Sequence, residues 1–254
     1  MIMKHYLIIL PFIIVLLSFG NNLKAEEFAV EIAQHHIDVT VGFTGSSIVL
    51  FGDRRDVDAD VAIVVEGPRK DITMWKKAKV MGTWINRYYI TLKNMPVYYS
   101  YASTISEDVK GDNIDLIMRY NGIGHRALFT SVDMNKSRSV KDVEEFQNSF
   151  LKKKIYKGVY FEKPATIKFY NDYFFGVRFE IPASAQTGAY KIHSFLIKNG
   201  KVIEKRTQKL RVQQVGVNAF VYNLAYRHSL FYAILCIALA LFCGWFASVV
   251  RVRP

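Results

Sequence analysis

The feature that most constrains this chain is an uncharged apolar run near its C-terminus. The 22 residues from Ser229 to Val250 include no acidic or basic side chain. A helix rising ~1.5 Å per residue would cover ~33 Å over this run, which is enough to cross a bilayer core. A buried helix of a soluble protein would keep a polar face, and this run has none. The sequence therefore predicts a transmembrane helix over 229–250, with the basic tail 251–254 in the cytoplasm.

The N-terminus has the pattern of a secretory signal peptide. Lys4 precedes an uncharged apolar run from Tyr6 to Phe19, and Leu23-Lys24-Ala25 stands before the first acidic residue. The apolar run is short for a membrane span. We predict a signal peptide over residues 1–25; an uncleaved anchor is the alternative, because the cleavage pattern is loose. Together with the C-terminal span, this gives a bitopic protein with its bulk across the membrane from the cytoplasm.

Cysteine and charge usage limit what the exported part can be. Both cysteines, Cys236 and Cys243, fall within the predicted span, which excludes a disulfide-stapled ectodomain and a cysteine-based metal or redox site there. The formal net charge is +12, and the excess of basic residues persists over residues 26–228. Export makes nucleic acid an implausible partner for that charge, whereas anionic headgroups are a physical alternative.

Residues 26–216 are dominated by short segments rich in Val, Ile, Phe, Tyr and Thr, bounded by turn residues. Asn199-Gly200 predicts a tight hairpin between 190–198 and 201–212, because both turn positions favour positive φ. An amphipathic helix is expected after Ser139, with apolar residues at helical spacing through Ile155. The predicted fold is mainly β, with two immunoglobulin-like β-sandwich-type units, an intervening amphipathic helix and one C-terminal transmembrane helix.

The predicted organisation has seven segments. The exported part comprises an N-terminal periplasmic β unit over 26–105, and a segment over 106–157 with two strands, Ile114–Arg119 and Ala127–Val132, before the helix. A C-terminal β unit follows over 158–216. A juxtamembrane amphipathic segment over 217–228 then leads into the span 229–250 and the tail 251–254.

Six phrases carry a resemblance to a known family. They are Val49-Leu50-Phe51-Gly52-Asp53, Gly82-Thr83-Trp84-Ile85-Asn86, Met95-Pro96-Val97-Tyr98-Tyr99, Ile181-Pro182-Ala183, Thr187-Gly188-Ala189-Tyr190 and Gly244-Trp245-Phe246-Ala247-Ser248. In this order and spacing the chain resembles the "putative transmembrane protein" family of alphaproteobacteria. The resemblance implies placement in the bacterial inner membrane with a periplasmic ectodomain. It also associates such proteins with anion transporters of the sulfite-exporter type that are encoded nearby. It supplies no catalytic residues.

No pattern in the chain predicts catalysis or a cofactor. Asp53, Asp56, Asp58 and Asp60 lie in one turn, but the glycine and glutamate that an EF-hand needs are absent, so a solvated turn is expected and calcium binding is the alternative. Nothing in the spacing of the histidines gathers them into a metal site. No nucleophile elbow or dinucleotide fingerprint is present. We expect neither an enzyme nor a resident metal.

Two groups of residues are candidates for binding. Trp75, Tyr89 and Tyr99 belong to an aromatic-rich stretch with lysines nearby, for which core packing is the default expectation and a binding surface is the alternative. Lys205 and Arg206 belong to a basic hairpin before the anchor, for which contact with anionic headgroups and a plain solvated face are both open. An exposed subset of these side chains would suit an anionic partner.

Within the predicted span, small residues recur every four positions, at Cys236, Ala240, Gly244 and Ser248. Such a line lets a second helix approach closely in lipid. The function predicted from the sequence is therefore an accessory partner of a multi-spanning membrane protein, such as an anion transporter. The alternative is a binding module for a periplasmic ligand or an envelope polymer. The expected partners are the lipid bilayer and either another integral membrane protein or a second copy of this chain.

Overall fold

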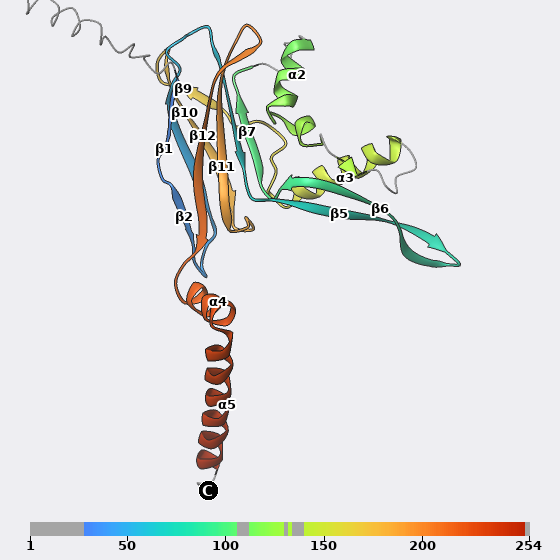
Figure 1. Ribbon diagram of the computed structural model, residues 1–254, viewed down its shortest axis with the longest axis vertical. Coiled ribbons are helices and arrows are strands. Elements are labelled where there is room, and N and C mark those ends of the chain that lie inside the picture. The colour runs from blue at the N-terminus through green and yellow to red at the C-terminus, as the bar shows by residue number, and fades with distance from the viewer. Residues whose placement is uncertain (1–27, 106–111, 130–131, 134–139, 252–254) are drawn as a thin grey trace, which may run out of the picture.

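The computed structural model describes residues 28–105, 112–129, 132–133 and 140–251, and their centre is a sandwich of two β-sheets (Figure 1). One sheet has four strands in the order β1 (Ala29–Ile32), β3 (Gly45–Asp53), β10 (Phe174–Pro182) and β9 (Ile167–Phe169). The other has five, in the order β2 (His36–Val39), β12 (Lys201–Gln214), β11 (Gly188–Lys198), β4 (Asp60–Glu66) and β7 (Tyr99–Ser103). The β2–β12 pair is parallel, and the other pairs are antiparallel.

Strand β4 explains why the molecule has two cores. Its residues Val61, Ile63 and Val65 point between the two sheets, while Ala62 and Val64 point to the opposite side. A strand covered on both faces must be apolar at consecutive positions, and every residue of β4 from Val61 to Glu66 is buried. The second core lies beneath the helical elements α2 (Asp112–Tyr120), η1 (His125–Phe129) and α3 (Val140–Tyr156).

A long hairpin leaves the side of the sandwich. Strands β5 (Arg69–Val80) and β6 (Thr83–Pro96) form it, and the short β8 (Val132–Asp133) pairs with the root of β6. Helix α3 packs on one face of this hairpin, where Val143 and Phe146 cover Ile90. The part beyond α3 projects away from the rest of the chain (Figure 1), and we call the β5–β6 hairpin the arm.

The mainly β fold is confirmed, but the strands expected in two separate units interleave in shared sheets. Strand β10 pairs along its whole length with β3, from Phe174↔Asp53 to Pro182↔Gly45. Strand β11 pairs with β4 from Lys191↔Glu66 to Ile197↔Asp60. Neither set of strands could bury its apolar face alone, so the early and late parts of the chain complete one sandwich.

Two strands predicted in the middle of the chain are helical. The strand predicted at Ile114–Arg119 is wrong, because α2 occupies this segment. Ile114 and Met118 pack against the second core, while Leu116 between them is 63% exposed, which fits a helix and not a strand. The strand predicted at Ala127–Val132 is also wrong over 127–129, which form the end of η1. Residues 130–131 lie outside the described residues.

Other expectations for local structure are confirmed. Asn199 and Gly200 adopt φ values of 50° and 67° in the turn between β11 and β12. The predicted amphipathic helix is α3, although Ser139 lies outside the described residues. Helix α4 (Val217–Arg227) occupies the juxtamembrane segment. The predicted signal peptide also lies outside the described residues.

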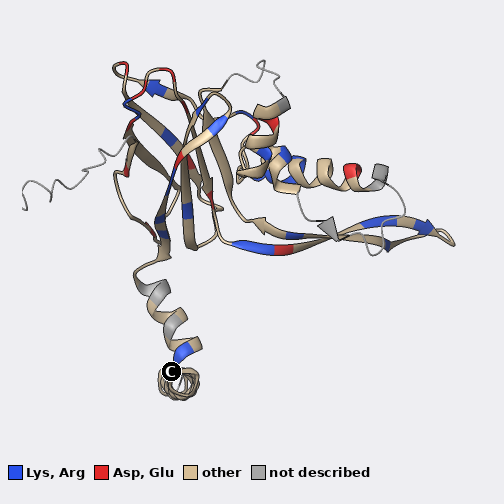
Figure 2. Cartoon of the chain, turned by 45° about the horizontal axis from the view of Figure 1, so that its top comes forward, with Lys and Arg blue, Asp and Glu red and all other residues tan. Residues whose placement is uncertain are grey.

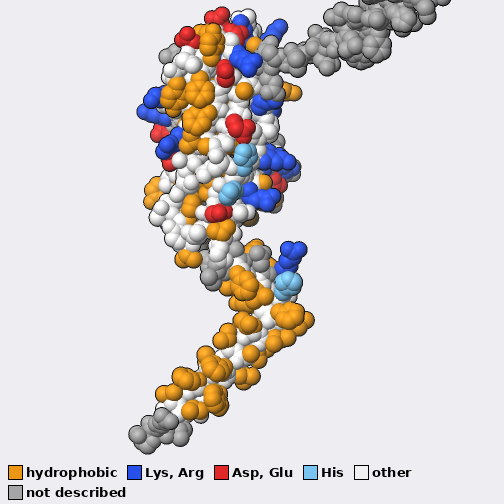
Figure 3. All heavy atoms as spheres, turned by 90° about the vertical axis from the view of Figure 1, so that its left-hand side faces the viewer, with side chains coloured by type: hydrophobic (Ala, Val, Ile, Leu, Met, Phe, Trp, Pro, Cys, Tyr) orange, Lys and Arg blue, Asp and Glu red, His pale blue; other side chains and the backbone are white. Residues whose placement is uncertain are grey.

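Helix α5 (Ser229–Arg251) ends the described chain and stands apart from the sandwich (Figure 1). Its stretch Ser229–Val250 is long and apolar enough to cross a membrane, with a mean hydropathy of 2.5 and none of it buried against the rest of the protein. Figure 3 shows its visible face covered by hydrophobic side chains. A helix that is apolar all round and unburied is suited to lipid.

Candidate functional site

The small-residue line lies on α5. Cys236, Ala240, Gly244 and Ser248 are all exposed in this helix. A Cβ added at Gly244 would meet no other atom within 4 Å, so the space beside the glycine is open. Residues four apart on a helix are neighbours on one face. The line is therefore accessible to a second helix in the membrane.

The three aromatic candidates do not share a surface. Trp75 and Tyr89 are register partners across the arm, with ring centroids 4.8 Å apart, and Trp75 is 53% exposed. Tyr99 is fully buried in β7, so its assignment to a binding surface is wrong. Its hydroxyl donates to the carbonyl oxygen of Gly122 at 2.7 Å, and burial raises the pKa of this phenol. The aromatic run around Tyr99 fills the cores on both faces of its strand.

Lys205 and Arg206 are adjacent in β12 and line two different hollows. The Nζ of Lys205 lies 5.1 Å from the ring centroid of Phe195, a cation–π contact. The Nε of Arg206 donates to Oε1 of Glu204 at 2.7 Å. Because successive side chains in a strand point to opposite faces, these two cations cannot form one patch.

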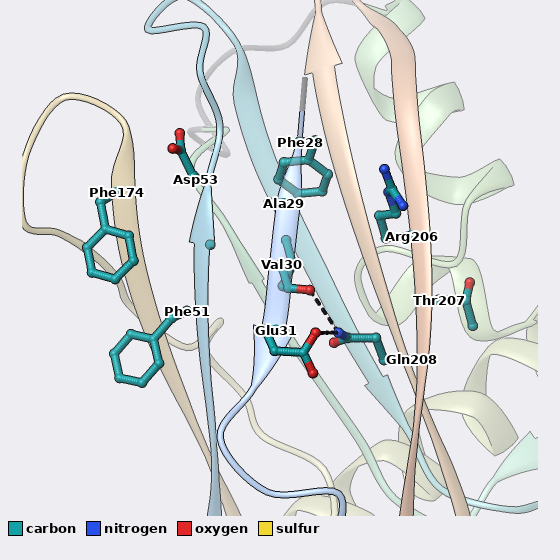
Figure 4. A pocket seen from close by; sticks show the side chains of 11 residues that line it. Phe28, Ala29, Val30, Glu31, Phe51, Asp53, Phe174, Arg206, Thr207 and Gln208 are labelled. Atoms are coloured by element: carbon teal, nitrogen blue, oxygen red, sulfur yellow. Dashed lines mark hydrogen bonds between the residues drawn. The ribbon is translucent and has the colours of Figure 1, made fainter. Parts of the chain in front are cut away.

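The hollow beside Arg206 lies where β1 and β12, from opposite sheets, come together (Figure 4). It has a volume of about 490 Å³. The amide of Gln208 crosses the gap, donating to the carbonyl oxygen of Val30 at 2.8 Å and to a carboxylate oxygen of Glu31 at 3.1 Å. Phe51 and Phe174 stack at its other side with ring centroids 5.9 Å apart. These contacts join the edges of the two sheets and converge on no reactive group.

The hollow beside Lys205 is a smaller cavity of about 240 Å³, which we call the basic cavity. Its charged lining comes from four separate parts of the chain: Glu66, Arg69, Lys93, Arg119 and Lys205. Four basic side chains thus face one carboxylate. That arrangement suits a small anion better than a cation or an apolar ligand.

Part of this charge is already used within the protein. The guanidinium of Arg69 contacts both carboxylate oxygens of the buried Glu66, at 2.6 and 2.7 Å through Nη2, and its Nη1 donates to the carbonyl oxygen of Asn94. Nearby, Nδ1 of His193 lies 2.9 Å from the hydroxyl of Thr207. Burial lowers the pKa of His193, which favours the neutral imidazole. Arg119 is also paired, since its Nε lies 2.9 Å from a carboxylate oxygen of Asp115. Lys93 and Lys205 complete the basic lining of the cavity.

The acidic turn is held together by donors from the protein. The Nζ of Lys198 contacts a carboxylate oxygen of Asp56 at 2.5 Å, and this hydrogen bond is the main reason why the pKa of Asp56 is lowered. Asp53 accepts the backbone N–H of Arg55, and Asp60 accepts the hydroxyl of Thr104. Within the described residues, no three His, Cys, Asp or Glu side chains are grouped so that they could hold a metal ion.

Sequence reasoning missed the basic cavity and the length of the arm. The residues that line the cavity lie far apart in the chain, so only the fold brings them together. The arm had a local signal: Met81-Gly82 stands between two stretches of strand-forming residues and could have been taken as a two-residue hairpin turn.

Comparison with protein-family models shows which family the chain belongs to. Residues 27–253 match the family described as "Putative transmembrane protein (Alph_Pro_TM)". The chain belongs to this family. Membership and the apolar α5 agree on a single-pass membrane protein, which confirms the resemblance and the span predicted from the sequence. A search among curated proteins gave no match.

Proposed function

We propose that this single-pass protein is an accessory partner of a multi-spanning membrane protein, such as an anion transporter. The observation that carries the proposal is the open line of small side chains on α5, formed by Cys236, Ala240, Gly244 and Ser248. Helices associate in lipid through close packing, because lipid tails remove the hydrophobic drive that operates in water. A line of small residues allows that packing along about three turns of α5.

The proposed orientation places the sandwich in the periplasm and α5 in the bacterial inner membrane. The signal-peptide pattern before residue 26 and the basic residues Arg251 and Arg253 after the span support it. Protease added to intact spheroplasts should digest the sandwich. Digestion only after the spheroplasts are lysed would contradict this orientation.

The proposed role involves no catalysis. Glu66 and Arg69, which line the basic cavity, are paired with each other, and among the described residues of this cavity no nucleophile is aligned with a base. The sandwich would instead cover or contact the exported face of the partner.

Purification of the full-length protein from native membranes in mild detergent, with mass spectrometry of the chains that accompany it, tests the proposal. A stoichiometric multi-spanning partner is the expected result. A clean monomer or homodimer would contradict the accessory role.

A second function is favoured by one specific observation. The basic cavity, with Lys93, Arg119 and Lys205 around a volume of about 240 Å³, supports a module that binds a small periplasmic anion. Titration of the full-length protein in detergent with sulfate and with acetate, followed by calorimetry, tests it. Saturable binding that is lost in Lys205→Gln and kept in Lys209→Gln would support the module; no heat with either anion would contradict it.

A further inference from the structure

The distal arm, Trp75 to Tyr89, has an unusual composition. It holds two of the three tryptophans of the chain, Trp75 and Trp84. It also holds four basic residues and no acidic one, the basic residues being Lys76, Lys77, Lys79 and Arg87. Figure 2 shows the resulting basic colouring along the projecting hairpin.

The strand register places both tryptophans on the same face. Trp75, Lys77 and Lys79 alternate along β5, and Trp84 is the register partner of Lys79. Trp75 is 53% exposed and Trp84 is 65% exposed. We call this the outer face of the arm, formed by Trp75, Lys77, Lys79, Trp84, Asn86 and Tyr89.

Helix α3 covers the other face. Ile90 is buried against Val143 and Phe146 there, and Nζ of Lys76 contacts a carboxylate of Glu145 at 2.6 Å. The arm is thus fixed to the body through one face near its root. The outer face and the turn remain exposed to whatever surrounds the protein.

The turn gives independent evidence that this exposure is functional. Met81 and Gly82 form it with φ values of 49° and 85°, a conformation that favours asparagine at the first position. The β11–β12 hairpin has Asn199 at the corresponding place, with φ 50°. Met81 is instead a large apolar side chain, fully exposed at a position that is strained for it. Folding of the turn does not explain that choice.

The charges on β5 disfavour a strand of a second protein copy as the binding partner of the arm. Strand β5 is an edge of its three-stranded sheet, and edge strands with unpaired backbone groups can recruit a second copy. Lys70, Lys76, Lys77 and Lys79 lie along this edge. Lysines on an edge strand oppose such pairing.

Tryptophan beside lysine and arginine is the side-chain mixture found where proteins meet anionic membrane surfaces. This chain spans a bilayer through α5, so a membrane surface is always close to the rest of the chain. In Figure 1 the arm slopes towards the end of the sandwich from which α4 and α5 extend. We propose that the outer face and turn of the arm bind anionic lipid headgroups of the bilayer that α5 spans, with Trp75, Met81 and Trp84 entering the interface. This inference is independent of the partner proposed for α5.

Tryptophan fluorescence of the full chain tests it directly. Trp245→Phe leaves Trp75 and Trp84 as the only tryptophans. This variant would be placed in nanodiscs of phosphatidylglycerol and phosphatidylethanolamine, with and without lipids brominated near the headgroup end of the acyl chains. Quenching by the brominated lipid is expected in these anionic discs and not in discs of phosphatidylcholine. Salt at about 0.5 M should reduce the quenching by about half or more, because it screens headgroup attraction.

A matched pair of charge reversals separates the arm from general charge effects. Lys77→Glu with Lys79→Glu should weaken the quenching at least as much as salt does. Lys152→Glu with Lys153→Glu, which makes the same charge change on exposed positions of α3, should leave it unchanged. Absence of quenching in anionic discs at low salt would overturn the proposal and favour a protein partner for the arm. Equal quenching in phosphatidylcholine discs would overturn the role of anionic headgroups. The salt titration needs no substitution in the arm, so a folding defect of the arm variants cannot decide the result.

Discussion

Met81 and Asn199 occupy the same place in two different hairpins, the first position of a two-residue turn, with φ values of 49° and 50°. The left-handed region costs most residues about 1 kcal/mol, and asparagine tolerates it better. The two hairpins thus differ in whether the turn residue suits its own backbone.

We expect Met81→Asn to raise the free energy of unfolding by up to about 1 kcal/mol, and Asn199→Met to lower it by a similar amount. Thermal unfolding of the full-length variants in detergent measures both. A loss of stability in Met81→Asn would mean that the methionine is held by contacts within the fold, and would remove the argument that its exposure is functional.

The ion pair between Glu66 and Arg69 should matter for stability. Glu66 is buried, and the nearest contact in the pair is 2.6 Å. Arg69→Leu would leave a buried carboxylate without its cation and should lower the free energy of unfolding by about 2 kcal/mol, below the value for a fully buried pair because Arg69 is partly exposed. Adding Glu66→Gln should recover part of the loss. An Arg69→Leu protein that melts like the wild type would refute this account of the pair.

Tyr160 anchors the segment after α3 to the root of the arm. Its buried hydroxyl donates to the carbonyl oxygen of Pro96 at 2.7 Å. Tyr160→Phe keeps the ring and removes the donor, so we expect a loss of about 1 kcal/mol in denaturant unfolding. Tyr156→Phe is the matched control, since Tyr156 is exposed and should tolerate the change.

Lys154 should make the protein more stable at alkaline pH. Partial burial, helped by Lys70 and Lys157, lowers the pKa of this lysine from 10.5 to about 8. Between these values the unfolded chain binds more protons than the folded one, so this residue makes stability rise with pH through that window.

We expect Lys154→Met to raise the melting temperature at pH 7. The expected gain in the free energy of unfolding is about 1 kcal/mol, after allowing for the partial exposure of Lys154. The gain should fade towards pH 10.5, where the wild-type lysine is neutral in the folded state and about half deprotonated in the unfolded state. Lys152→Met, on an exposed position of the same helix, should show no such pH dependence. Equal gains at pH 7 and pH 10.5 would show that packing, and not charge, is the cause.

The sequence predicted the features that depend on neighbouring residues. The apolar α5, the Asn199-Gly200 turn and the amphipathic α3 each carry a local signal, and each is confirmed. Helix α2 was misread because Ile114, Leu116 and Met118 also fit the alternation of a strand. Only the exposure of Leu116 separates the two interpretations, and that depends on what packs nearby.

The interleaved sandwich and the basic cavity could not be predicted in this way. Pairing of β10 with β3 joins residues more than a hundred positions apart, and the sequence of neither strand indicates which strand it will pair with. The same holds for Tyr99, whose sequence neighbourhood fits a surface or a core equally well. Its burial follows from β7 being covered by α2 and η1, elements that lie after it in the chain.

The central claim is that α5 docks through its line of small residues, and a matched pair of substitutions tests it most directly. Ala240→Ile places a bulky side chain on the line, whereas Ala238→Ile makes the same change two residues earlier, on the opposite face of the helix. The measurement is the amount of multi-spanning partner recovered with each full-length variant from native membranes, relative to the bait. The account predicts a loss of about tenfold for Ala240→Ile and wild-type recovery for Ala238→Ile. Equal recovery with both variants would contradict it.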